Sequence, residues 1–110
     1  MSKRAIVKID GIDVPQFEEF DEFSPTVEGR PWFECSMVSA CAPLFDCESN
    51  YEVEKKLQEA KVILPNNDCD SESCALVVNF ASLKSANAFI KRLNAYLAEK
   101  AKRLVAAQSF

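Results

Sequence analysis

The sequence has no histidine and only two glycines. Histidine is the commonest metal ligand and the most versatile general base, so its absence excludes a Ser-His-Asp triad and histidine-based metal sites. Gly11 and Gly29 are too few for the glycine-rich loops that bind phosphate in nucleotide enzymes. We therefore expect a non-enzymatic protein that uses no cofactor.

Long apolar runs are also missing. The longest, such as residues 75–78, cover only a few positions, whereas a membrane-spanning helix needs about 20. The basic residues Lys3 and Arg4 are not followed by the apolar stretch and cleavage site of a secretory signal. The sequence thus predicts a cytoplasmic protein without membrane contact.

Five cysteines are present, an odd number, and with no export signal this favours reduced thiols over a disulfide framework. They are Cys35, Cys41, Cys47, Cys69 and Cys74. The spacing of Cys69 and Cys74 is permissible for zinc, but no Cys-x-x-Cys pair occurs. The acidic run 68–72 lacks the glycine and the final glutamate of a calcium-binding loop. We expect no metal site.

The first half of the chain predicts strands. With 48% hydrophobic and 27% charged residues in 110 positions, the composition is that of one globular domain over residues 1–110. Residues 5–9 and 12–14 around Asp10-Gly11 predict a hairpin, which we expect Pro15 to end. Residues 16–30 are expected to form a surface excursion with a helical turn. Alternation over residues 33–37 predicts a third strand.

The second half predicts two helices. Ser49 and Glu52 match a capping box for a helix over residues 50–62. Residues 74–80 are nearly all apolar and predict a buried strand, after which Ser82 caps a helix of about 20 residues. We therefore predict an α+β fold: a single two-layer domain with a mainly antiparallel sheet of about four strands, two helices on one face and a long C-terminal helix.

One segment alternates aromatic and acidic side chains. It consists of Phe17, Glu18, Glu19, Phe20, Asp21, Glu22 and Phe23. If the segment were helical, its three phenylalanines would lie near one face with carboxylates beside them, as in acidic segments that bind basic, apolar grooves. The alternative is that the phenylalanines fill the core of the domain while the acids face water. We take the seven residues as the candidate partner-binding site.

Charge is unevenly distributed along the chain. The segment after Ala81 carries six basic residues and one acidic residue, and the preceding part carries seven basic and sixteen acidic ones. An acidic surface repels nucleic acid and favours basic partners, whereas the basic helix end is typical of a solvated face. We expect no direct contact with nucleic acid.

These patterns predict a small acidic protein-binding module. Its expected partner is a basic or nucleic-acid-binding protein complex, which it would inhibit. Small acidic antagonists of host defence encoded by phages and mobile elements have this composition, an analogy only. The alternative is a structural or self-assembling subunit that forms a homodimer through the apolar stripe of the C-terminal helix.

Overall fold

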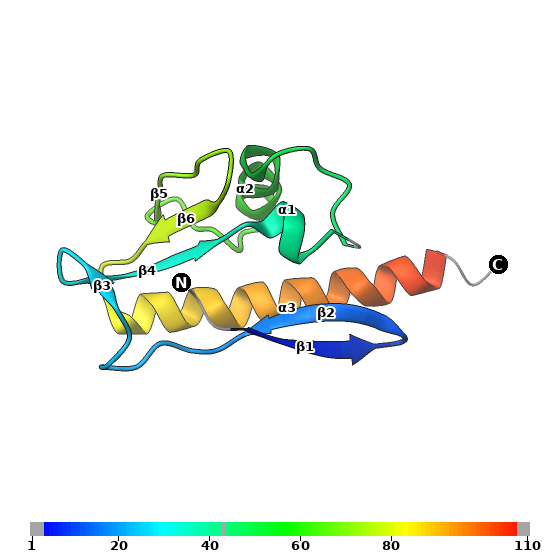
Figure 1. The fold of residues 1–110 in the computed structure, drawn as a ribbon, viewed down its shortest axis with the longest axis horizontal. Helices are drawn as coiled ribbons and strands as arrows, with labels where there is room; N and C mark the ends of the chain where they lie inside the picture. Colours follow the sequence, from blue (N-terminus) through cyan, green and yellow to red (C-terminus); the bar gives the residue numbers. More distant parts are fainter. Residues whose placement is uncertain (1–3, 43, 108–110) are drawn as a thin grey trace.

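A long C-terminal helix is flanked by two antiparallel sheets (Figure 1). The computed structural model describes residues 4–42 and 44–107. In chain order the elements are β1 (Arg4–Ile9), β2 (Ile12–Phe17), β3 (Thr26–Val27), β4 (Arg30–Cys35), α1 (Met37–Ala40), α2 (Asn50–Glu59), β5 (Asp68–Cys69), β6 (Leu76–Asn79) and α3 (Leu83–Ala107). This arrangement confirms the predicted α+β class.

The hairpin β1–β2 forms a sheet of its own. Its turn residues Asp10 and Gly11 have φ angles of 51° and 87°, which suit the primed turn that matches the twist of a hairpin. The prediction that Pro15 ends the second strand is wrong, because β2 continues through Pro15 to Phe17. Pro15 lies opposite Ile6, at a position where a missing N–H removes no bond between the two strands.

The other sheet has four antiparallel strands in the order β3-β4-β6-β5. One face is buried, and its residues on the two central strands are Pro31, Phe33, Cys35, Leu76 and Val78. β3 and β4 form a second hairpin across Glu28 and Gly29, which have φ angles of 53° and 75°. Both glycines of the chain therefore occupy two-residue hairpin turns.

Helices α2 and α3 supply a large part of the remaining core. Ser49 caps α2 by accepting a hydrogen bond from the Glu52 amide at 3.3 Å, and Ser82 accepts one from the Ser85 amide at the start of α3. The core combines the buried sheet face with Val53 and Leu57 of α2 and a stripe of α3. That stripe consists of Ala86, Phe89, Ile90, Leu93, Leu97 and Ala101.

Several predicted boundaries shift. The strand expected over residues 33–37 is β4, which ends at Cys35, and Met37 begins the short helix α1. The helix expected to reach residue 62 ends at Glu59, because Lys61 adopts a φ of 64°. Residues 18–24 contain no helical turn. In the described part of the chain, no helix is both long and apolar enough to cross a membrane.

Candidate protein-binding surface

The acidic aromatic segment, residues 17–23, is fastened to α3 by two asparagines. The Phe17 amide donates to Asn94 Oδ1 at 2.8 Å, and Asn94 Nδ2 donates to the Phe17 carbonyl at 2.9 Å. Asn87 makes the same pair of bonds with Phe20, at 2.6 and 2.9 Å. Asn87 and Asn94 are seven residues apart and so lie on one side of the helix. The two asparagine side chains form hydrogen bonds with the main chain of the segment as a neighbouring strand would, and so fix its path.

The three phenylalanines do not share one face. Phe17 is only 4% exposed, and its ring meets that of Phe33 edge-on at 5.0 Å. Phe20 is half-buried and lies 6.5 Å from the Phe80 ring. The interpretation of these aromatics as core residues therefore holds for Phe17 and in part for Phe20. The helical arrangement that would have aligned all three is absent.

Phe23 is placed differently, at the surface in a tight turn. The Asp21 carboxylate accepts hydrogen bonds from the Phe23 amide at 2.9 Å and from the Ser24 hydroxyl at 3.3 Å. The Ser24 hydroxyl in turn accepts one from the Asp21 amide at 3.0 Å, and the Ser24 amide donates to the Asp21 carbonyl at 3.1 Å. The Phe23 side chain is nevertheless 84% exposed. Four local hydrogen bonds thus fix a turn from which a large apolar ring projects into solvent.

Four carboxylates belong to the same segment as this ring. Glu18, Glu19, Asp21 and Glu22 are all exposed. Glu19 pairs with Lys91 at 3.7 Å, an exposed contact that contributes at most about 1 kcal/mol. Glu18 and Glu22 form no ion pair with any residue that the structure describes. The segment therefore combines one exposed aromatic side chain with uncompensated negative charge.

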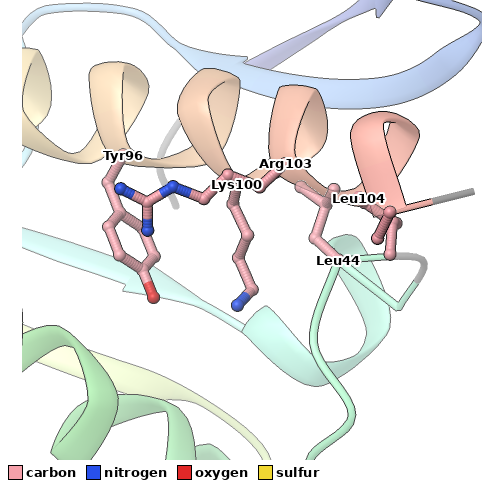
Figure 2. A pocket seen from close by; sticks show the side chains of 6 residues that line it. Leu44, Tyr96, Lys100, Arg103 and Leu104 are labelled. Atoms are coloured by element: carbon pink, nitrogen blue, oxygen red, sulfur yellow. The ribbon is translucent and has the colours of Figure 1, made fainter. Parts of the chain in front are cut away.

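A basic cleft lies near the C-terminal end of α3. It holds about 280 Å³ and is lined by Leu44, Tyr96, Lys100, Arg103, Leu104 and Ala107. Figure 2 shows Lys100 and Arg103 beside the Tyr96 ring, with Leu104 further along the same helix and Leu44 facing it from the segment after α1. The Lys100 ammonium is 5.2 Å from the centre of the Phe45 ring and 5.9 Å from that of Tyr96, distances that permit cation–π attraction. Burial raises the pKa of the Tyr96 phenol. This cleft is opposite in charge to the acidic segment.

The cysteines are scattered over the fold. Cys35 and Cys41 are buried, Cys74 is exposed, and all five thiols are free. Burial, and secondarily the Cys35 thiol, raises the pKa of Cys41 to about 12. Burial likewise raises the pKa of Cys69 to about 11, with Glu54 and Asp68 adding to the shift. Such thiols are protonated near neutral pH, while metals and electrophiles react with thiolates. Across residues 4–42 and 44–107, no three His, Cys, Asp or Glu side chains are grouped so that they could hold a metal ion.

No protein-family model matches the chain, and searches of curated proteins and of solved structures find no match. A proposal about function therefore rests on the surface of the protein. The sequence marks this segment as unusual, but it did not lead us to the two asparagine anchors on α3. Asparagine is a poor residue for a helix interior, and its recurrence at positions 87 and 94 was the available signal.

Proposed function

We propose that this protein is a small acidic, non-enzymatic protein-binding module that docks on a basic surface of a larger protein. One observation supports the proposal above all others: the Asp21–Ser24 turn holds Phe23 exposed in a segment that carries four carboxylates. A soluble domain gains no stability from an exposed phenylalanine, whereas covering such a ring in a complex contributes about 1.5–3 kcal/mol.

The geometry of the turn favours binding in two ways. Because the turn and the Asn87 and Asn94 anchors already fix the backbone, little conformational entropy is lost when a partner covers the ring. The carboxylates of the segment attract a basic partner over a distance of about 10 Å at ordinary salt and so raise the rate of encounter. Phe23 then slows dissociation, as buried aromatic anchors do in other interfaces.

The partner class that fits this surface is a basic protein, or the basic protein of a nucleic-acid-handling complex. A basic surface of that kind normally binds phosphates, and the module would compete with nucleic acid for it. Inhibition is then the simplest consequence of binding. Antagonists of host defence that phages or mobile elements encode are one setting in which such a module would act.

Photo-crosslinking from position 23 tests the proposal. A benzophenone amino acid replaces Phe23 in one variant and Tyr51 in a control, since Tyr51 is also an exposed aromatic, at 53%, but lies in α2. We expect position 23 to capture basic proteins from the native host and position 51 not to. Capture should fall when Glu18, Glu19 and Glu22 are changed to glutamine. Equal capture from both positions would contradict the proposal.

A further inference from the structure

Strand β1 lies at one outer side of the molecule, beyond β2 and α3 (Figure 1). Residues 4–8 are all exposed, although they alternate between the two faces of the hairpin. Ile6 is 57% exposed and Val7, on the opposite face, is 43% exposed. The cause is that β2 lies between β1 and α3 and makes most of the hairpin's contact with the helix. β1 therefore leaves one edge, one face and part of the other face uncovered.

The open edge follows from the register of the hairpin. Pro15 has no N–H, so its partner Ile6 belongs to a pair without mutual hydrogen bonds. By alternation, the main-chain N–H and C=O groups of Arg4, Ile6 and Lys8 point away from β2. No residue in the described part of the chain bonds these groups. The other edge of the hairpin is closed, because Pro15 offers no donor and Asn94 binds the Phe17 main chain.

We propose that β1 pairs with β1 of a second copy of this chain, antiparallel and about a two-fold axis at Val7. Unpaired edge strands are surfaces on which another strand can add. In this register Ile6 of one copy exchanges main-chain hydrogen bonds with Lys8 of the other. The result is a continuous four-stranded sheet that crosses the dimer, β2-β1-β1-β2.

Side-chain complementarity selects this register. Val7 already lies opposite Val14, so a Val7 axis creates an unbroken apolar row of four valines across the sheet. It also places Arg4, whose guanidinium lies 3.9 Å from Cys35 Sγ within its own protomer, across the ladder from the oppositely charged Asp10 of the other copy. An axis at Ile6 would instead place Arg4 opposite Lys8, and like charges directly across a ladder are destabilising.

The apolar stripe of α3 cannot serve as the interface that the sequence suggested. Its six residues are buried within the protomer. The exposed edge of β1 offers a different surface for a symmetric dimer. The proposal is independent of the acidic segment, so Phe23→Ala should leave the mass in solution unchanged.

A proline tests the edge itself. Ile6→Pro removes an outward N–H without touching a hairpin bond, just as Pro15 does on the neighbouring strand. Ile6→Thr, the control, keeps the N–H and a β-branched side chain. We expect light scattering to give twice the chain mass for the wild type and for Ile6→Thr, and the chain mass for a folded Ile6→Pro.

A charge pair tests the register and does not depend on proline being tolerated. Val7→Lys and Val7→Glu each place like charges at the axis and should be monomeric, while their mixture should recover a dimer of one copy of each. A wild type that is monomeric at every accessible concentration would overturn the proposal. So would two single variants that remain dimeric, or a mixture that stays monomeric.

Discussion

Phe17, Phe20 and Phe23 are evenly spaced in the sequence and occupy three different environments. Phe17 ends a strand and meets Phe33 in the core, Phe20 lies half-buried in the irregular stretch beyond it, and Phe23 projects from a turn. A pattern of residue types assigns a face only when the secondary structure is known. The spacing of three therefore led to a helical arrangement that the backbone does not adopt.

Alanine substitutions at Phe17 and Phe23 should distinguish the buried environment from the exposed one. Phe17→Ala removes an aromatic ring from the core and should lower the free energy of unfolding by about 3–5 kcal/mol. Phe23→Ala removes a ring that contacts mostly water, and the change should stay within about 0.5 kcal/mol. Urea unfolding followed by circular dichroism measures both. If Phe23→Ala were as destabilising as Phe17→Ala, the exposed position of Phe23 would be wrong.

Among the elements, those with a clear local signal in the sequence were predicted and the shortest strands were not. Asp10-Gly11 indicated the hairpin, and Ser49 and Ser82 indicated the starts of two helices. These signals are local, because a turn or a helix cap depends on residues that are close in sequence. The two-residue strands β3 and β5 are too short to show a periodicity, although each pairs with the next strand along the chain. The separation of the hairpin into its own sheet depends on its contacts with α3, which are distant in sequence, and could not be predicted.

The contact between α3 and the acidic aromatic segment is the tertiary contact on which the candidate site depends most. Asn94→Ala would leave the Phe17 amide and carbonyl without partners, which should cost about 1–3 kcal/mol. The amide hydrogen of Phe17 should also exchange faster with solvent. Asn66→Ala is the matched control, since Asn66 is exposed, and its effect should stay within about 0.5 kcal/mol. Equal stability of both variants would mean that the side-chain bonds of Asn94 do not hold the segment.

At the scale of the whole molecule, two surfaces of opposite charge lie apart along α3. The acidic turn around Phe23 lies near the start of α3, and the basic cleft with Lys100 and Arg103 lies near its end (Figure 1). A basic partner therefore experiences attraction at one end and repulsion at the other, which orients the encounter. The sequence predicted the imbalance between its two parts, whereas the fold shows that α3 keeps the two surfaces apart.

The association rate with a partner captured at position 23 tests this account most directly, when it is measured as a function of salt. The comparison is between the wild type and a variant in which Glu18, Glu19, Asp21 and Glu22 are replaced by their amides, which leaves the Asp21 turn an oxygen acceptor. We predict that the variant associates more slowly at low salt and with a flatter salt dependence, while its thermal stability is retained. An amide variant that associates as fast as the wild type at low salt would contradict the acidic docking surface.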